Sequence, residues 1–375
     1  MNVEAITLTH IRVPFVRPFR NSNGEVTEKE AVLVQVASGG LVGTGEASPM
    51  TGSFYSDETP SSVWKFLVER LVPAVLASGA GSAAEVNRVL ARTGGSPCAR
   101  AGIETAFWDL EARAGGRPLW EQLGGTRIPV ESGLSVGIEK GIPQLIDTIE
   151  RHLAEGYRRV KVAVRPGWDV GPLGEIRQRF GDIPLSVDAG GSYSRGDLTH
   201  LRSFDAFELT MIEQPLPPGD LKAHAELQAG IRTPVCLDES VGDLPTLRRA
   251  LRGKCCRIVN IAIQRVGGLA VARAMHEACA AAAIPVWAGT MPELGIGAAQ
   301  ALHLSTLPGF TYPTDVASSA RWFVDDIIAP MIEVRNGIVT LPAGTGNCYE
   351  VSENAVARYR TARRVFTPRA RRSTV

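Results

Sequence analysis

The most constraining feature of this sequence is a regular spacing of short apolar runs between residues 158 and 293. Runs rich in β-branched residues end at Ala163, Asp188, Glu213, Asp238 and Ala262, and the steps between successive ends are 25, 25, 25 and 24 residues. Such a step accommodates one strand, one helix and two loops, so it predicts consecutive βα units. In a parallel barrel the equivalent positions of successive units meet at the C-terminal rim, where such barrels place their chemistry. The three carboxylates on this spacing are therefore expected to converge.

The bulk composition narrows the class of protein. The chain has 375 residues and a formal net charge of +1, which argues against a large nucleic-acid footprint. No apolar stretch approaches the length of a membrane span, and no signal peptide is evident. None of the six cysteines forms a CxxC pair. These observations predict a cytoplasmic protein with reduced thiols, which binds neither nucleic acid nor membrane.

The N-terminal part is expected to be an α+β unit. Residues 3–16 and 31–38 have the pattern of paired antiparallel strands, and the polar segment 18–28 between them is interpreted as a mobile loop. A second loop at 45–59 carries aromatic residues, as loops that close over ligands often do, although packing on a neighbouring element is an equal alternative. Apolar residues at helical spacing then predict helices, which lie at 61–78, 83–93 and 101–116.

The barrel pattern begins near residue 130 and ends near residue 319. Its first strand is predicted at 131–138, and it carries Ser135 at a height suited to substrate contact. The seventh strand, within 285–295, has Met291 and Glu293 at its exit, and 308–316 is the expected eighth strand. We therefore predict a capping domain at 1–125, a barrel at 126–319, and a return of residues 320–375 to the cap. Seven arginines and no acid lie between Arg358 and Arg372, which we interpret as a solvated, partly disordered tail.

The three rim carboxylates predict a metal site. Asp188, Glu213 and Asp238 supply hard oxygen ligands from three adjacent strand ends, and Mg²⁺ (or Mn²⁺) prefers such ligands. Without a cation, three carboxylates packed together would repel one another and force protonation. The alternative is that each acid caps the following helix or pairs with an arginine, which explains one acid more easily than three.

The sequence resembles the enolase superfamily, and within it the muconate-lactonizing subgroup. The segments IEQPL at 212–216, CLDES at 236–240 and RVGGL at 265–269, in that order, carry the resemblance most specifically, and it extends over nearly the whole chain. The similarity is greatest to N-acylamino acid (N-succinylamino acid) racemases that also act as o-succinylbenzoate synthases. It implies a modified TIM barrel with an α+β capping domain, and isomerase or lyase activity on a small carboxylate-bearing substrate.

The resemblance also assigns residues. It implies that Asp188, Glu213 and Asp238 hold the metal, with Glu239 as a further acid behind these ligands. It implies that two cap loops, near 19–24 and 50–58, cover the substrate. The residues expected to contact substrate are Phe19, Phe54, Tyr55, Ser135, Gly190, Met291 and Glu293. Such proteins are also expected to form homo-oligomers.

The sequence departs from the family at the groups that move protons. The family abstracts the proton α to a carboxylate with two lysines, one from a K-x-K segment and one at the end of the sixth strand. Here the K-x-K segment reads Lys161-Val162-Ala163, and the sixth-strand position is Ala262. Lys161, which the resemblance places near the enolate oxygens, is retained. Gly190 stands where an asparagine is usual.

Three explanations of the alanines remain open. The two residues are engineered substitutions in a racemase or synthase, or the protein has diverged to a lyase or cyclase reaction that uses the metal as a Lewis acid. In the third, it is a pseudoenzyme that binds its ligand without turnover. A lone-base role for Lys161, with its pKa lowered by burial, is a further hypothesis. Tyr193 and Glu293 also lie at the correct rim to transfer a proton.

Overall fold

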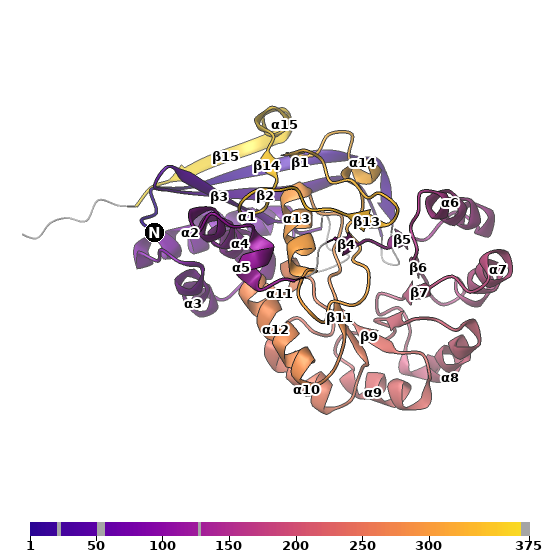
Figure 1. Cartoon of the computed structure of the whole chain (residues 1–375). Helices are drawn as coiled ribbons and strands as arrows, with labels where there is room; N and C mark the ends of the chain where they lie inside the picture. The colour runs from indigo at the N-terminus through magenta and orange to yellow at the C-terminus, as the bar shows by residue number, and fades with distance from the viewer. Residues whose placement is uncertain (21–23, 51–56, 127–128, 369–375) are drawn as a thin grey trace, which may run out of the picture.

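The computed structural model describes residues 1–20, 24–50, 57–126 and 129–368, and it contains two principal sheets. A four-stranded antiparallel sheet, which we call the cap sheet, lies at one end of the molecule (Figure 1). Its strands, in spatial order, are β15 (Arg360–Phe366), β1 (Ala5–Arg20), β2 (Glu25–Ser38) and β3 (Leu41–Ala47). A parallel sheet forms the second unit, so the α/β fold with a modified barrel and an α+β cap is confirmed.

The hairpin between β1 and β2 is longer than the sequence predicts. The segment 18–28 was expected to be a loop, yet Phe19 pairs with Val26 and Arg20 with Glu25. The register shifts between Pro14 and Phe19, which is the mark of a β-bulge. The bulge takes up the irregular proline-containing stretch and allows pairing to resume beyond it. As a result the end of β1 extends to the mouth of the barrel.

Helices cover one face of the cap sheet. They are α1 (Pro60–Phe66), a π-helical turn (Leu67–Leu71), α2 (Val72–Ser78), α3 (Ala83–Thr93) and α4 (Pro97–Ala114). The longest of them, α4, packs against β2 and β3. A Cβ on Gly45 would lie 2.2 Å from the carbonyl oxygen of Gly102, so only glycine allows this strand and helix to approach so closely. Helix α4 begins earlier than predicted, because the Ser96 side chain accepts a hydrogen bond from the backbone of Ala99.

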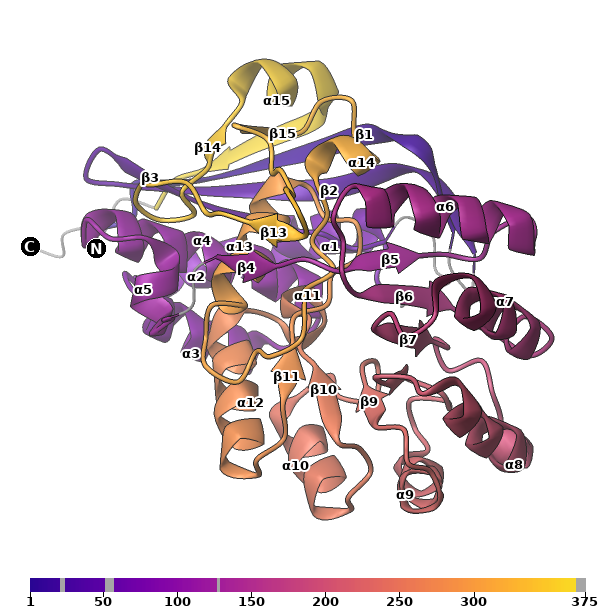
Figure 2. The same ribbon diagram turned by 45° about the vertical axis from the view of Figure 1, so that its right-hand side comes forward.

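The parallel sheet has seven strands in sequence order, and helices lie outside it (Figure 2). The strands are β5 (Leu134–Val136), β6 (Val160–Ala163), β7 (Leu185–Asp188), β8 (Ile212–Glu213), β9 (Val235–Leu237), β10 (Ile258–Asn260) and β11 (Val286–Trp287). The helices that connect them are α6 (Ile142–Ala154), α7 (Val170–Phe180), α8 (Leu198–Arg202), α9 (Leu221–Gly230), α10 (Leu244–Arg252), α11 (Ile263–Val266) and α12 (Leu269–Ala281). Each predicted βα unit from residue 158 onward is present.

The sheet closes through a short irregular eighth segment. Phe310 bridges Val286 and Thr314 bridges Ser132, both in parallel orientation, so the segment between them lies where the eighth strand was expected. The first strand is shorter than the predicted 131–138. Its beginning, β4 (Val130–Glu131), pairs instead with β13 (Ile338–Val339), outside the barrel. Helix α13 (Gly295–Leu304) lies between β11 and this closing segment, and α14 (Ser319–Trp322) follows the segment.

The C-terminal segment differs from the predicted solvated tail in its first half. Helix α15 (Glu353–Tyr359) leads directly into β15, which pairs with β1 along six residues of register. Arg358 at the end of that helix forms an ion pair with Asp325. The sequence does not predict this strand, because β15 is an edge strand whose side chains are mostly exposed and therefore shows no apolar pattern. The predicted domain boundaries near residues 125 and 319 remain a prediction.

Two further sequence features concern the thiols and the helices. All six cysteines are buried and free. Within the residues described, none of the helices combines the length and the apolar character needed to cross a lipid bilayer.

Candidate active site

A cavity of about 760 Å³ lies at the C-terminal ends of the barrel strands. Its inner wall is formed by residues at the ends of β6 to β10, including Asp188 and Glu213. Its outer wall is formed by the end of β1, the segment before α6, and α14. Since α14 also contacts β1, the cap and the barrel both shape this space.

The predicted carboxylates do meet in this cavity. Asp188 ends β7 and Glu213 ends β8, and the two are direct partners in the register of the sheet. Asp238 follows β9 by one residue, and Glu239 comes next. We call Asp188, Glu213, Asp238 and Glu239 the acidic floor. All four line the cavity, and the 25-residue spacing of the first three brings them together because it equals one βα unit.

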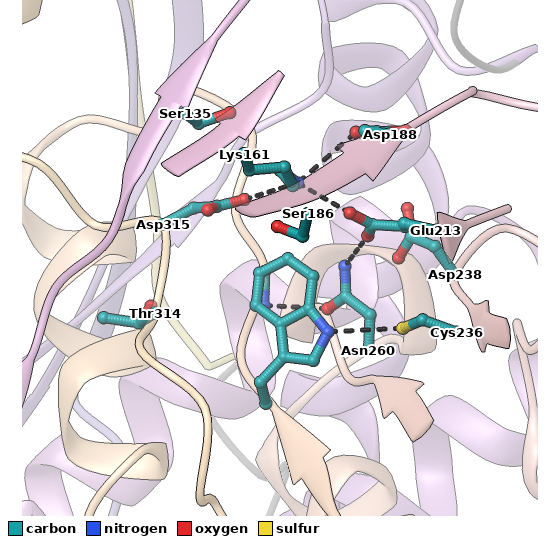
Figure 3. A network of polar contacts seen from close by, with 12 residues as sticks. Ser135, Lys161, Ser186, Asp188, Glu213, Cys236, Asp238, Asn260, Thr314 and Asp315 are labelled. Carbon is teal, nitrogen blue, oxygen red and sulfur yellow. Dashed lines mark hydrogen bonds and ion pairs between the residues drawn. The ribbon is translucent and has the colours of Figure 1, made fainter. Parts of the chain in front are cut away.

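Lys161 is the cation at the centre of the floor. Its Nζ lies 2.7 Å from Glu213 Oε2, 2.8 Å from Asp315 Oδ2 and 3.3 Å from Asp188 Oδ2 (Figure 3). Nζ also lies 4.7 Å from the centroid of the Trp287 ring beneath it, within cation–π range. Burial opposes the charge on this ammonium, but Asp315, Glu213 and Asp188 outweigh it and hold the Lys161 pKa well above its usual range. A lone-base role would need the opposite shift, so the surrounding carboxylates do not support that role, and it stays a hypothesis.

Asp315 is held between two cations. Arg159 Nη2 lies 3.1 Å from Asp315 Oδ1, on the side opposite Lys161. Burial raises the pKa of this carboxyl, but Lys161 and Arg159 outweigh it, so the pKa is lowered. Asp315 is therefore an ionised partner that fixes the position of Lys161.

The other half of the floor is more acidic than its partners can balance. Arg265 forms an ion pair with Asp238, and Asn260 Nδ2 donates to Glu213 Oε1 at 2.8 Å. The Oε2 atom of Glu239 is buried and has no hydrogen-bond partner within the described residues. Burial is the main cause that raises the pKa of Glu213 to about 8, and the neighbouring charges of Asp188 and Asp238 add to it. Buried carboxyls with raised pKa values and a free oxygen are what a cation-binding site is expected to contain.

The fit of a divalent metal can be judged from these donors. As the side chains stand, no group of three acidic, histidine or cysteine residues in the described chain is arranged to hold a metal ion. The floor nevertheless presents oxygen donors only, its Glu213 and Asp238 are buried, and it includes one unpartnered carboxylate oxygen. This donor chemistry suits Mg²⁺ or Mn²⁺ and disfavours softer metals.

The two alanines lie at the cavity wall. Ala163 ends β6 and pairs in register with Asp188, while Ala262 follows β10 and precedes α11. Both line the cavity, and Ala262 has an exposed fraction of only 8%. Neither methyl group can accept or donate a proton, so the wall is inert at both points.

The remaining predicted contacts are distributed unevenly. Phe19, Ser135, Gly190, Met291 and Glu293 all line the cavity. The backbone of Gly190 has a φ of 51°, a left-handed conformation, and its N–H donates to Asp188 Oδ1 at 3.0 Å. Burial raises the Glu293 pKa to about 8. The other two, Phe54 and Tyr55, lie outside the described residues.

Tyr193 is not a wall residue of this cavity. Its hydroxyl donates to Asp169 Oδ2 at 2.8 Å, and His200 Nε2 lies 2.8 Å from the same oxygen. Burial and the neighbouring Asp169 raise the pKa of the Tyr193 hydroxyl. The ring is buried, with an exposed fraction of 2%, and its hydroxyl bonds a residue of the preceding βα loop, so it serves packing.

Sequence reasoning missed several residues that define the site. Asp315 lies just after the eighth segment, so the βα spacing continues to it, but the step from Glu293 is irregular. Asn260 lies two residues before Ala262 and binds both Glu213 and the backbone N–H of Gly289 at 2.7 Å. Arg159 and Trp287 carry no signal in the sequence, because their roles depend on which strands become neighbours.

Comparisons with known proteins agree with this architecture. The pattern of the enolase C-terminal domain-like family matches residues 144–355, and that of the mandelate racemase / muconate lactonizing enzyme N-terminal domain matches residues 4–124. An o-succinylbenzoate synthase from Geobacillus kaustophilus is 40% identical over 367 residues, covering 98% of each chain. An N-succinylamino acid racemase from Thermus thermophilus is 39% identical, covering 92% of this chain and 94% of the relative.

Solved structures give the same answer. The structure of an enolase superfamily member from Listeria innocua Clip11262 superposes with a TM-score of 0.94 at 29% identity, covering 98% of this chain and 100% of the other. Together with the two family patterns, which span most of the sequence, these similarities decide the family. The chain belongs to the enolase superfamily.

Proposed function

We propose that this protein binds a carboxylate-bearing small molecule through a divalent metal, on a framework of the o-succinylbenzoate synthase and N-succinylamino acid racemase type. The observation that carries the proposal is the acidic floor, where four carboxylates line one cavity and one buried oxygen of Glu239 lacks a partner. Relatives with those two activities, 40% and 39% identical over most of the chain, support the type of framework.

Asp188, Glu213 and Asp238 would hold Mg²⁺, with Glu239 behind them. When bound, the metal supplies positive charge that stabilises negative charge developing on a substrate carboxylate. Lys161 is kept protonated and in place by Asp315 and Glu213, so its positive charge would attract a substrate carboxylate. The cap loops near 19–24 and 50–58 would set the specificity for the rest of the substrate.

Proton transfer by this chain is expected to be severely weakened. In the proposed assignment, Ala163 and Ala262 stand where relatives carry the acid and base lysines, and both face the cavity. General acid–base groups each contribute about 10²–10⁴ in rate, so losing two such groups leaves little racemisation or elimination.

The test is α-proton exchange in D₂O, followed by NMR, with Mg²⁺ and N-succinyl-L-phenylalanine. The chain as it stands is compared with a variant carrying Ala163→Lys and Ala262→Lys, and with a control carrying Ala163→Met and Ala262→Met, which fills the same space without a base. We expect exchange to rise by about 10² or more in the lysine variant alone. Rapid exchange in the unaltered chain, unchanged by the lysines, contradicts the proposal.

A second candidate is a lyase or cyclase that uses the metal as a Lewis acid without the lysine pair. Glu293 favours it, because this carboxyl lines the cavity and burial raises its pKa to about 8, so it retains a proton at neutral pH. This candidate predicts Mg²⁺-dependent binding with no exchange in the unaltered or lysine-bearing chain. A pseudoenzyme predicts the same binding and turns over no carboxylate. The two candidates are distinguished by incubation with an unsaturated dicarboxylate. A lyase or cyclase forms product, and Glu293→Gln abolishes that product formation, whereas a pseudoenzyme forms none.

A further inference from the structure

Gln214, the residue directly after the floor carboxylate Glu213, has an unusual backbone conformation. Its φ is 37°, in the left-handed region that residues other than glycine rarely adopt. The residue is completely buried, with an exposed fraction of 0%. A strained backbone persists only where the surrounding contacts hold it, and such residues cluster at functional sites. Gln214 is therefore expected to have contacts that keep it in this conformation.

The side-chain amide of Gln214 uses its full hydrogen-bonding capacity. Its Oε1 atom accepts from the backbone N–H groups of Asp238 at 3.0 Å and of Ser240 at 3.1 Å. Its Nε2 atom donates to Ser240 Oγ at 2.7 Å and to the carbonyl oxygen of Leu216 at 2.8 Å. Both lone pairs of the oxygen and both N–H groups are thus occupied. Oε1 thereby holds both ends of a three-residue segment that contains Asp238 and Glu239, two of the four floor carboxylates.

The backbone of Gln214 is bonded to the neighbouring strands on both sides. Its N–H donates to the carbonyl oxygen of Cys236 on β9 at 2.8 Å, and its carbonyl oxygen accepts from the N–H of Gly191 at 2.7 Å. Gly191 lies three residues after the floor carboxylate Asp188, and the N–H of Gly190 between them donates to Asp188 Oδ1 at 3.0 Å. Gln214 therefore binds the exits of β7 and β9 while it forms the exit of β8.

We infer that Gln214 is a positioning residue, which fixes the exits of three adjacent strands relative to one another and so sets the separation of the floor carboxylates before a cation binds. Neighbouring carboxylates repel one another, so without these bonds the exits would tend to separate in the metal-free protein. The consequence for a metal rests on the proposed function, whereas the fixed geometry of the strand exits does not. Loss of a polar group that orients metal ligands weakens metal binding by about 10- to 100-fold.

Two matched variants separate positioning from burial. Gln214→Met keeps the length of the side chain and removes every hydrogen bond of the amide. The control is Gln228→Met, at a second buried glutamine, which lies on α9 and outside the cavity lining. Gln228 Oε1 accepts from the N–H of Val235, the first residue of β9, at 2.8 Å. Each variant removes a buried acceptor from one end of β9, but only Gln214→Met removes it beside the floor.

The first measurement is hydrogen exchange of backbone amides in the metal-free protein, by NMR. In the unaltered chain the N–H groups of Asp238, Ser240 and Val235 should be protected. In Gln214→Met we expect Asp238 and Ser240 to exchange about tenfold faster or more, as the loss of one hydrogen bond predicts. Val235 should stay protected there and lose protection in Gln228→Met. Fast exchange of Asp238 and Ser240 in the unaltered chain, or protection that survives in Gln214→Met, overturns the inference.

The second measurement is the dissociation constant of Mg²⁺ by calorimetry, at a temperature at which circular dichroism shows each variant folded. Gln214→Met should weaken binding by about 10- to 100-fold, and Gln228→Met by no more than about twofold. Equal affinity of Gln214→Met and the unaltered chain, or equal weakening by the two variants, overturns the inference. If the unaltered chain binds no Mg²⁺ but shows the expected exchange pattern, the metal role is contradicted and the positioning role is supported, so the two failures are distinguishable.

A third variant decides the matter if Gln214→Met does not fold. Ser240→Ala removes only the hydroxyl that accepts from Gln214 Nε2, so it loosens the amide and leaves its Oε1 bonds possible. We expect faster exchange at the Asp238 and Ala-substituted positions and Mg²⁺ binding weakened by about tenfold. Exchange and Mg²⁺ affinity that both match the unaltered chain would overturn the inference.

Discussion

Buried carboxylates occur in two regions of this protein, and they are satisfied in different ways. At the interface between cap and barrel, Glu104 accepts hydrogen bonds from the backbone N–H groups of Leu269 and Ala270 at the start of α12, at 2.7 and 2.8 Å. Glu46 accepts from Leu294 and Gly297 at the start of α13, at 2.9 and 2.8 Å. Both oxygens of each carboxylate are occupied, and the positive end of a helix dipole faces each one.

The acidic floor of the cavity is also formed by carboxylates, but not all of their oxygens have a hydrogen-bond partner among the described residues. Its carboxylates face one another, one cation (Lys161) is shared by two of them, and Glu239 keeps a free oxygen. Burial alone therefore does not identify a functional acid, because both regions contain buried carboxyl groups. The distinguishing feature is unused acceptor capacity next to like charge, which is why we propose the floor as a binding site and regard the interface as a structural joint.

The largest effect is expected from removing an interface carboxylate. Glu104→Ala leaves two backbone N–H groups and the Trp108 indole N–H, which donates to Glu104 Oε1 at 2.6 Å, without their acceptor. Buried donors left unsatisfied cost about 1–3 kcal/mol each, so we expect a loss of about 4 kcal/mol in the free energy of unfolding, measured by urea titration. Glu104→Gln retains one acceptor oxygen and should lose clearly less. Equal losses in the two variants would contradict this account of the joint.

The second effect separates the floor from the interface by adding metal. At Mg²⁺ concentrations near 100 times the dissociation constant, binding to the folded state stabilises it by about 2.7 kcal/mol, which a thermal melt detects as a rise in Tm. Glu213→Gln should abolish this rise, because it removes a proposed metal ligand. Glu104→Gln changes a carboxylate that is equally buried but lies at the interface, and it should keep the rise. An equal rise in both variants would place the metal outside the floor.

The sequence predicted the floor because its members are tied to strand ends at a fixed spacing, which the topology of a βα barrel converts into proximity. It could not predict the partners of the floor. Lys161 was expected near the substrate, but its ion pair with Asp315 was not. That ion pair depends on the irregular closing segment, which brings Asp315 beside β6. The sequence also could not predict the hydrogen bonds that satisfy the interface carboxylates, since Glu104 is 165 residues from the backbone N–H that it accepts from.

The third effect concerns pH, and its sign follows from the raised pKa of Glu104. Burial raises this pKa from 4.5 to about 7, so between these values the unfolded chain has released a proton that the folded chain still holds. The free energy of unfolding contributed by this group is therefore highest below pH 4.5 and falls as pH rises toward 7. In the unaltered protein this group lowers the free energy of unfolding as the pH rises from 5 to 7. In Glu104→Gln we expect that fall to be smaller by about 2 kcal/mol. An unchanged pH dependence would mean that the carboxyl is ionised throughout.

The smallest effect is expected where a carboxylate is neither buried nor short of partners. Glu226 pairs with Arg195 at 2.7 Å on the surface, with about half of each side chain exposed. Exposed ion pairs contribute about 0–1 kcal/mol, because water already solvates both charges and salt screens them. Arg195→Gln should therefore change neither the stability in urea beyond experimental scatter nor the Mg²⁺-induced rise in Tm. A loss of stability as large as that of Glu104→Ala would contradict this account. It would mean that the distance between charges, rather than burial and hydrogen bonding, determines how much a carboxylate contributes to stability.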